Sequence, residues 1–306
     1  MTETVKLAGV TKTYGTFNAI SDASYVLNAG ENIALVGHNG AGKTTMIKLM
    51  LGLIRPTHGK VLVLGEDPAA GQFAARRKLG YLPEHVSFNM ALTGRETLSF
   101  YAKLKSVPVK ETAALLDHVG LSHAADRRVG TYSKGMRQRL GLAQALLGKP
   151  AVLLLDEPTT GLDPALRKNF YDLLEVIRAE GTTILMSSHA LTELENRVGR
   201  VIIANRGKVI ADGSLDDLRH IARLPVRIRV SLAEGETAPQ SIGQSLRIGW
   251  RKTGFASFEA DVSAEDKMQI LNSVIAQNHN ITNIDVMAPT LDELYAHFLT
   301  VKEAAE

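Results

Sequence analysis

The sequence contains no cysteine, no long hydrophobic run and little excess of either charge. Without cysteine, the 306-residue chain forms no disulfide and has no thiolate to act as a nucleophile or a metal ligand. The longest apolar stretches run for about five residues, as at 151–155, whereas a membrane-spanning helix needs about 18. The first residues also lack the charged and then apolar layout of a secretory signal. These absences favour a cytoplasmic protein that reaches a membrane only through a partner.

The two signs of charge are nearly balanced. Against 32 Asp and Glu there are 35 Lys and Arg, which gives a formal net charge of +3. So small an excess does not form the dense basic patch typical of nucleic-acid-binding proteins, and no nucleic-acid partner is expected. The hydrophobic fraction of 45% is ordinary for a globular protein, and the length suits one large domain or two smaller ones.

Short apolar runs alternate with helical patterns over about the first 210 residues. Several of the apolar runs are unbroken, which is typical of strands that are buried on both faces. The predicted strands cover residues 5–10, 33–36, 61–64, 152–155, 184–186 and 201–204. Thr93 and Glu96 form a capping box at the start of one helix, and Asp163 followed by Pro164 begins another. We therefore predict an α/β domain with a mostly parallel sheet over residues 1–220, with an inserted helical subdomain at about 84–148.

The character of the sequence changes at 215–225. Val226, Ile228, Val230 and Leu232 alternate with polar residues, which predicts a half-buried strand. Further strands are predicted at 255–262 and 281–286, and helices at 264–276 and 291–299. Residues 221–306 are therefore predicted to form a small α+β domain.

Three glycines, a lysine and two threonines lie between a buried strand and an apolar helix. They match the pattern G-x-x-x-x-G-K-[ST], and an accidental glycine-rich turn does not explain why strand, loop and helix follow in this order. Glycines allow backbone N–H groups to surround a phosphate, and the helix N-terminus adds favourable partial charge. We expect Lys43 to reach the β- and γ-phosphates of a nucleotide and the Thr44 hydroxyl to bind Mg²⁺. The predicted phosphate-binding residues are Gly37, His38, Asn39, Gly40, Ala41, Gly42, Lys43, Thr44 and Thr45.

A second acidic site follows the apolar run at 152–155, which ends in Asp156 and Glu157. We expect Asp156 to hold Mg²⁺, directly or through water, and Glu157 to orient and deprotonate the attacking water. A general base of this kind contributes about 10²–10⁴-fold to a rate. Two acids after a strand are alone equally consistent with a polar turn, but beside a phosphate loop they favour nucleotide hydrolysis.

Three more stretches occur in a fixed order with the phosphate loop. They are TYSKGMRQRLGLAQALL at 131–147, TTGLDP at 159–164 and LMSSH at 185–189. Together with the loop they resemble the ATP-binding-cassette (ABC) ATPases, over roughly residues 3–220. The resemblance implies the P-loop nucleotide-binding fold of that family, with ATP and Mg²⁺ as cofactors and ATP hydrolysis as the activity.

The same resemblance implies roles for single residues. Ser133 and the Gly135 backbone would contact the γ-phosphate of ATP held by a second copy of the chain, and Asp163 would lie at the interface of the two copies. His189 would touch the γ-phosphate and orient the water. Tyr14 would stack on adenine, although an ordinary aromatic residue beside a strand is the alternative. ATP would then close a dimer and hydrolysis would reopen it, which is a switch able to drive a partner.

Two positions depart from the family pattern. The usual L-S-G-G-Q reads Tyr-Ser-Lys-Gly-Met at 132–136, where the serine and the second glycine are kept. Glu84 stands where the family usually has glutamine. A glutamate still offers an oxygen to Mg²⁺ or to water, but it adds negative charge beside a triphosphate. A loop acid without a role in metal binding is the alternative.

A single cassette without fused membrane spans implies the ATPase subunit of a multi-subunit transporter. Stretches at 80–98, 119–150, 224–230 and 288–299 resemble one subgroup, the ATP-binding subunits of the transporter that matures the copper site of nitrous oxide reductase. That resemblance implies a membrane permease and a periplasmic accessory protein as partners, and a position on the inner face of the cell membrane.

Three other interpretations stay open at this stage. A soluble mechanical ATPase acting on nucleic acid or ribosomes would usually have two linked cassettes or large insertions. A nucleotide-binding regulator without hydrolysis is disfavoured because Glu157 and His189 are both present. The C-terminal domain contributes to dimer contacts or regulation, or it is a packing extension without a ligand.

Overall fold

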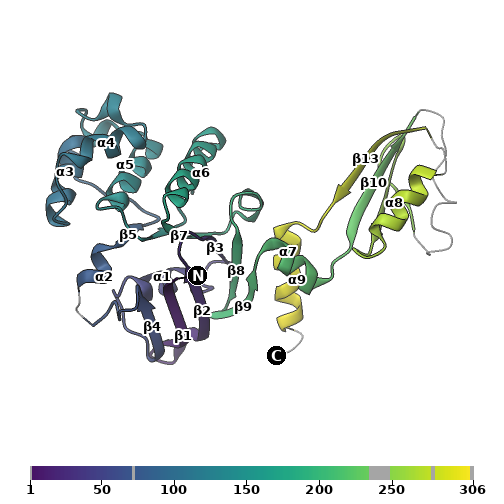
Figure 1. The fold of residues 1–306 in the computed structure, drawn as a ribbon, viewed down its shortest axis with the longest axis horizontal. Coiled ribbons are helices and arrows are strands. Elements are labelled where there is room, and N and C mark those ends of the chain that lie inside the picture. The colour runs from purple at the N-terminus through teal and green to yellow at the C-terminus, as the bar shows by residue number, and fades with distance from the viewer. Residues whose placement is uncertain (1, 71–72, 234–248, 277–279, 304–306) are drawn as a thin grey trace. The chain divides into compact units, whose positions relative to one another are not determined.

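The chain folds into two units, each with its own core. The computed structural model describes residues 2–70, 73–233, 249–276 and 280–303. The first unit comprises Met1–Ser214 and the second Leu215–Glu306, coloured from purple to green and from green to yellow in Figure 1. The division lies ahead of α7 (Leu215–Ala222) rather than after residue 220, because α7 packs against α9 (Leu291–Glu303) of the second unit.

A six-stranded sheet forms the centre of the first unit. Its strand order is β5-β6-β7-β3-β8-β9, and the pairs are parallel except for β8 with β9. The strands are β3 Asn32–Val36, β5 Leu79–Leu82, β6 Val152–Asp156, β7 Thr183–Ser188, β8 Arg200–Asn205 and β9 Lys208–Gly213. Every residue of β3, β6 and β7 is buried, as their apolar runs predicted. Because these parallel neighbours end at the same edge, the residues that follow them lie together.

An antiparallel sheet of three strands, in the order β2-β1-β4, lies in the same unit. The strands are β1 Glu3–Tyr14, β2 Phe17–Asn28 and β4 His58–Val63. The sequence predicted parts of β1 and β4 but not β2, because β2 alternates polar and apolar residues and has no unbroken apolar run. Helix α1 (Lys43–Met50) contacts strands of both sheets and buries Met46, Ile47 and Met50 in their shared core.

The segment between β5 and β6 is mostly helical, as predicted, and Figure 1 shows its helices gathered beside one another. Its α-helices are α3 Gly94–Leu104, α4 Glu111–His118 and α5 Lys134–Leu146. The capping box is confirmed, since Thr93 accepts a hydrogen bond from the Glu96 N–H and the Glu96 carboxylate accepts one from Thr93. Helix α5 packs on β5, where a Cβ at Gly80 would lie 2.4 Å from the Ala145 carbonyl oxygen. A short helix, α2 (Phe73–Arg77), precedes β5.

Helix α6 (Pro164–Ala179) follows β6 after a short loop. Its predicted start is confirmed, because the Asp163 carboxylate accepts a hydrogen bond of 2.9 Å from the Leu166 N–H and Pro164 occupies the first turn. The helix buries Phe170 and Leu174 against the rest of the unit. Its N-terminus therefore begins within a few residues of the acids that end β6.

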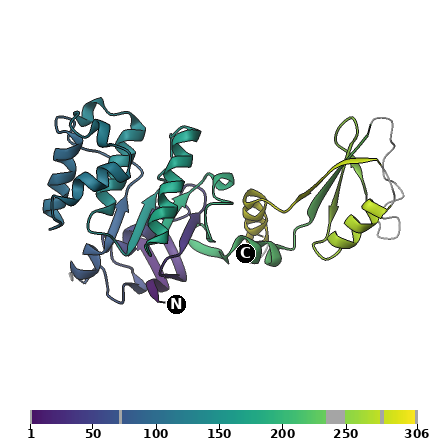
Figure 2. The ribbon, with the colours of Figure 1, turned by 45° about the horizontal axis from the view of Figure 1, so that its top comes forward.

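The second unit contains an antiparallel sheet with the strand order β11-β12-β10-β13. The strands are β10 Val226–Leu232, β11 Arg251–Lys252, β12 Ser257–Val262 and β13 Ile281–Met287. Helix α8 (Lys267–Ala276) packs on one face of this sheet, as Figures 1 and 2 both show, and buries Ile270 and Val274 against the apolar side of β10. The other face carries ion pairs such as Arg229 with Glu259. The loop predicted after β10 falls on residues 234–248, outside the described residues.

Candidate active site

The loop between β3 and α1 has backbone conformations that favour glycine. The φ angles of Gly40 and Gly42 are +86° and +100°. A Cβ on Gly37 would lie 2.5 Å from the Ala204 carbonyl oxygen, and one on Gly42 would lie 2.9 Å from that of Ala19. Gly42 is also the N-cap of α1 and provides no side-chain cap for its first turn. The helix N-terminus therefore offers its N–H groups to an anion, as the predicted phosphate loop requires.

A cavity of about 250 Å³ opens over this loop. Its lining joins the loop to both acids that follow β6 and to a residue of the β5–α3 segment. The lining residues are Phe17, Ala19, His38, Asn39, Gly40, Ala41, Gly42, Lys43, Thr44, Thr45, Glu84, Asp156 and Glu157. The structure thus brings the predicted phosphate loop and the predicted acidic site into one cavity, although more than a hundred residues separate them in sequence.

Lys43 is buried at the base of the loop. Its Nζ atom donates a hydrogen bond of 2.6 Å to the carbonyl oxygen of Gly37 and lies 3.4 Å from Oε1 of Glu157. A buried ammonium is stable only with such partners. The side chain therefore places a fixed positive charge between the loop backbone and the predicted general base.

Ser187, near the end of β7, fixes both acids. Its hydroxyl donates a hydrogen bond of 2.6 Å to Oδ1 of Asp156 and accepts one of 2.9 Å from the N–H of Glu157. Glu157 has a φ of +47°, an uncommon left-handed conformation for a residue other than glycine, which its surroundings must hold in place. Ser187 is not among the residues predicted from the sequence to act at the site. The available signal was a polar residue at the end of an otherwise apolar buried strand.

His189 follows β7 and contacts the same glutamate. Its Nδ1 atom lies 2.7 Å from Oε2 of Glu157, and its side chain is 58% exposed. The Glu157 carboxylate therefore lies between an imidazole on one oxygen and the Lys43 ammonium on the other. These contacts orient a carboxylate that is otherwise almost completely buried.

The residues predicted to bind Mg²⁺ provide oxygen ligands at the cavity. Asp156 is buried at its floor, and Thr44 is exposed in the first turn of α1. Glu84 also lines the cavity, is 44% exposed and has Oε1 3.7 Å from Nδ1 of His85. Burial, together with the negative charges of Asp156 and Glu84, raises the pKa of Tyr81 to about 12. A hydroxyl and carboxylates in a region of negative potential fit Mg²⁺, which usually takes its remaining ligands from phosphate and water.

The described ranges also set limits on the site. Within them, no three His, Asp or Glu side chains gather into a metal-binding cluster. No helix in the same ranges has both the length and the apolar character that crossing a bilayer requires.

The predicted residues that lie outside the cavity lining are Tyr14, Gly37, Ser133, Gly135, Asp163 and His189, of which His189 contacts the lining residue Glu157. Ser133 is the N-cap of α5, where its hydroxyl accepts a hydrogen bond of 3.2 Å from the Met136 N–H, and Asp163 caps α6. Both are exposed, whereas Gly135 is buried, and a Cβ there would lie 2.7 Å from Leu166. The structure therefore places Ser133 and Asp163 at two helix N-termini. Their contact with nucleotide through a second copy stays a prediction.

Tyr14 is half-exposed and also lies outside the cavity lining. The Nζ atom of Lys12 is 5.0 Å from the centroid of its ring, close enough for a cation–π contact. Phe17 pairs with Tyr14 across the turn between β1 and β2, is 64% exposed and does line the cavity. Sequence reasoning did not select Phe17, because an aromatic residue beside a turn gives no signal until the turn is placed next to the loop.

Comparison with known proteins gives a matching family model, related sequences and a related solved structure. A family model described as ABC transporter matches residues 20–160. Doxorubicin resistance ATP-binding protein DrrA of Mycobacterium tuberculosis is 39% identical over 224 residues, which covers 71% of this chain and 68% of that protein. Daunorubicin resistance ATP-binding protein DrrA3 of Streptomyces coeruleorubidus is 33% identical over an alignment of 314 positions, 98% of each chain. A solved structure described as an ATP binding subunit of an ABC transporter is 32% identical, has a TM-score of 0.66, and covers 71% of this chain and 92% of its own.

Proposed function

Because this chain belongs to the ABC transporter family and is an ATP-hydrolysing subunit of that family, we propose that ATP closes two copies of it into a dimer that drives a membrane permease. The observation that carries this proposal is the position of Glu157 between Lys43 and His189, in the cavity over the glycine loop. A soluble mechanical ATPase acting on nucleic acid is not favoured, because the relatives named above are transporter or resistance subunits.

Glu157 acts as the general base. Its carboxylate removes the proton from the attacking water, and Lys43 and His189 hold its two oxygens in position. The hydrogen bond from its N–H to Ser187 fixes the backbone at the end of β6. The second function of His189 is to orient the water and the γ-phosphate from the exposed side of the site.

The glycine loop and Lys43 bind the phosphates. The first N–H groups of α1 and the Lys43 ammonium supply hydrogen bonds and positive charge to the β- and γ-phosphates. Thr44, Asp156 and Glu84 would hold Mg²⁺, which would neutralise phosphate charge at the site. Phe17 or Tyr14 provides the aromatic contact with the adenine ring of ATP.

The exposed N-termini of α5 and α6 support a site shared between two copies. Ser133 and the Gly135 backbone bind the γ-phosphate in the cavity of the second copy, and Asp163 contacts that copy at the seam. Neither surface encloses the γ-phosphate by itself, so ATP joins the two copies and its hydrolysis weakens the joint. The permease uses this opening and closing at the inner face of the cell membrane.

The transporter is further proposed to be the one that matures the copper site of nitrous oxide reductase, in which the ATP-binding protein is NosF. The support is the sequence resemblance at 80–98, 119–150, 224–230 and 288–299, which extends into both units. The proposed partners are a membrane permease and a periplasmic accessory protein. The second unit is proposed to contribute to dimer contacts or regulation.

The replacement Glu157→Gln tests the activity directly. We expect the variant to keep ATP binding, to accumulate as a dimer with ATP, and to lose turnover by about 10²-fold or more, because the amide cannot accept the proton. Size-exclusion chromatography with ATP and a phosphate-release assay measure the two properties. Turnover close to that of the wild type would remove Glu157 from its proposed role.

Purification from the native membrane tests the choice of transporter. A permease that co-purifies in stoichiometric amount supports transport, whereas retained RNA or DNA without such a subunit contradicts it. In a native host carrying Glu157→Gln, we expect nitrous oxide reductase to lack copper at the matured site. If the reductase from that host carries its normal copper, the copper assignment is contradicted. The proposal that the chain hydrolyses ATP is not affected by that result.

A further inference from the structure

We propose that Arg167 and Glu193 are positioning residues, which hold the segment after β7 against α6 and so keep His189 on Glu157. The proposal rests on the roles proposed above for His189 and Glu157. Arg167 follows the N-cap of α6 by four residues, and Glu193 follows His189 by four residues. The pair therefore connects the start of one helix with the segment that carries the imidazole.

Arg167 and Glu193 form an ion pair between Nη1 and Oε1, and their side chains are 31% and 24% exposed. In the part of the chain that the structure describes, the Nε atom of Arg167 and Oε2 of Glu193 are buried and have no hydrogen-bond partner. The ion pair therefore provides the compensation for two charges that are partly removed from water. Loss of one member leaves the other uncompensated, which favours movement of the segment towards water.

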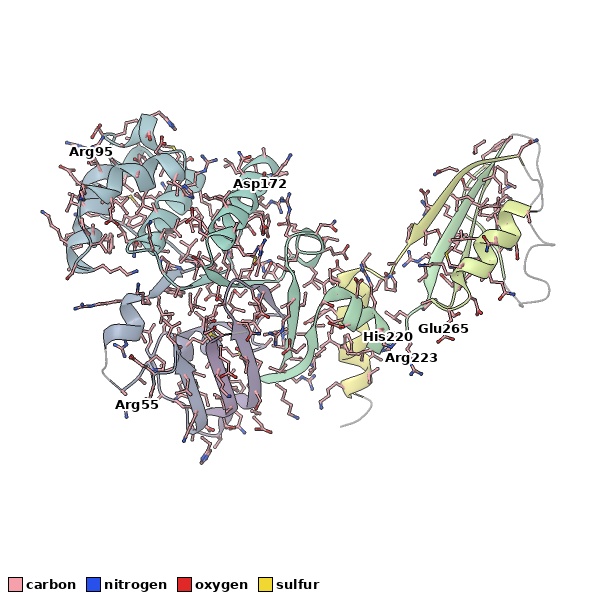
Figure 3. The ribbon with its side chains drawn as sticks, in the orientation of Figure 1. Arg55, Arg95, Asp172, His220, Arg223 and Glu265 are labelled. Carbon is pink, nitrogen blue, oxygen red and sulfur yellow. The ribbon has the colours of Figure 1, made fainter. Side chains whose placement is uncertain are left out.

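A second contact joins the far end of the same segment to α6. Arg197 pairs with Asp172 of α6, labelled in Figure 3, at 2.8 Å, and its guanidinium lies 5.7 Å from the centroid of the Tyr171 ring. The Arg197 carbonyl oxygen also accepts a hydrogen bond of 2.7 Å from the Asn32 side chain at the start of β3. The segment from His189 to Arg197 is therefore attached to α6 at two points and to the central sheet at one.

Helix α6 also contacts the loop that follows Glu157, the proposed general base. The Tyr171 side chain is buried and hydrogen-bonds Thr159, two residues after Glu157. Burial raises the pKa of Tyr171, and the bond from Thr159 and the positive charge of Arg167 partly offset that rise. One helix thus touches both the segment after Glu157 and the segment after His189.

The position of His189 depends on these contacts because its own side chain is poorly enclosed. The imidazole is 58% exposed and meets Glu157 at 2.7 Å. A single short turn, Leu191–Glu193, follows two residues after His189 and ends at Glu193 itself. The Leu191 side chain of this turn is buried. A shift of this turn by about 1 Å would move the imidazole off the carboxylate, and misplacement of that size costs up to about 10²-fold in rate.

The experiment measures ATPase kinetics of Arg167→Gln and Glu193→Gln in the full-length chain. We expect kcat to fall about tenfold while the KM for ATP changes less than about twofold, because the nucleotide contacts of the loop are untouched. Arg167→Lys keeps the charge and should keep most of the activity. Arg178→Gln is the matched control, since Arg178 pairs with Glu175 inside the same helix and its further hydrogen bond, of 3.5 Å to the Gly30 carbonyl, does not involve the segment from His189 to Arg197.

A double-mutant cycle separates positioning from general stability. In a His189→Ala background, Arg167→Gln should cause no further loss of kcat, because the group that it positions is gone. The exchanged pair Arg167→Glu with Glu193→Arg should recover activity relative to either reversal alone. An equal loss in both backgrounds, or an equal loss in Arg178→Gln, would overturn the proposal. Wild-type turnover in Glu157→Gln would instead overturn the proposed function.

Discussion

Lys43 carries a full charge in a buried position, and its neighbours explain how the fold tolerates it. Its ammonium is bonded to the Gly37 carbonyl and paired with Glu157, so that two groups share the compensation. A longer hydrogen bond of 3.4 Å reaches the His38 carbonyl, so a phosphate would replace one of the three contacts that the three donors of the ammonium make. At the scale of single residues, the site thus combines one buried cation with three acids, Glu84, Asp156 and Glu157, of which Glu157 pairs with the cation.

Replacement of Lys43 should weaken nucleotide binding more than it affects folding. We expect Lys43→Ala to raise the Kd for ATP by about tenfold or more, because charge-assisted bonds to the phosphates are lost. Lys48→Ala is the control, since Lys48 is exposed on the same helix. Calorimetric titration with a non-hydrolysable analogue measures the change, and equal Kd values for the two variants would contradict it.

Glu84 lines the cavity at the position where the family resemblance predicts glutamine. We expect Glu84→Gln to raise the Mg²⁺ concentration needed for half-maximal activity, because a neutral amide oxygen is a weaker ligand than a carboxylate. His85→Gln, at the exposed neighbour of Glu84, serves as the control. If Glu84→Gln leaves both the Mg²⁺ requirement and turnover unchanged, Glu84 has no part in the site.

At the scale of elements, the start of α3 shows how local sequence decides a helix boundary. Both halves of the capping box lie within four residues of each other, so no distant part of the chain is needed to form them. We expect Thr93→Ala to lower the free energy of unfolding by about 1 kcal/mol. Thr93→Ser keeps the hydroxyl and should lose much less. Chemical denaturation measures both, and equal stability of the two variants would contradict a capping role.

Lys105, at the end of α3, connects the helical segment to the sheet. Its ammonium donates hydrogen bonds of 3.0 Å to the Leu79 carbonyl and 2.7 Å to the Leu147 carbonyl. Burial lowers the pKa of Lys105 to about 8. The Lys105 amine is therefore partly unprotonated at a pH where the amine of an exposed lysine is still fully protonated.

This lowered pKa predicts a pH dependence of stability. Between about pH 8 and pH 10 the unfolded chain binds more protons at this lysine than the folded chain, so its contribution to stability increases with pH. Lys105→Met should remove that increase between about pH 8 and pH 9.5, whereas Lys103→Met, at an exposed position on the same helix, should keep it. Above about pH 10 the raised pKa of Tyr81 acts in the opposite direction, since the folded chain then retains the proton. Thermal unfolding at stepped pH tests the difference, and identical pH profiles for the two variants would contradict it.

At the scale of the whole molecule, each of the two units has a core of its own. The first is built on the two sheets around α1, and the second on β10, β12 and α8. The nucleotide cavity is lined entirely by residues of the first unit. Binding energy should therefore stabilise one unit and not the other.

We expect two unfolding transitions in calorimetry, of which only the first unit's responds to nucleotide. A non-hydrolysable ATP analogue with Mg²⁺ at about 100 times its Kd should stabilise that unit by about 2.7 kcal/mol. Lys43→Ala at the same analogue concentration should show a smaller shift. A single transition, or two that move together, would show that the units unfold as one.

The structural features that could be predicted from the sequence are those whose signal lies in residues close together along the chain. The glycine loop, the caps at Thr93 and Asp163, the buried parallel strands and the acids after β6 each carry their signal within a few positions. The helical nature of the segment before β6 and the α+β character of the second unit also followed from periodicity. Strand β2 did not, because half-exposed alternation resembles an ordinary surface segment.

The sequence by itself determined the family, the phosphate loop and the two acids, because the signal for each lies in residues that are close together along the chain. Only the tertiary structure decided that Ser187 holds both acids, that Phe17 lines the cavity, and that Arg167 meets Glu193. These contacts join residues from different strands and helices. A hydroxyl, a phenyl ring or an ion-pair partner has no spacing rule that announces it, and its role exists only once packing of the sheet and α6 brings the two segments together.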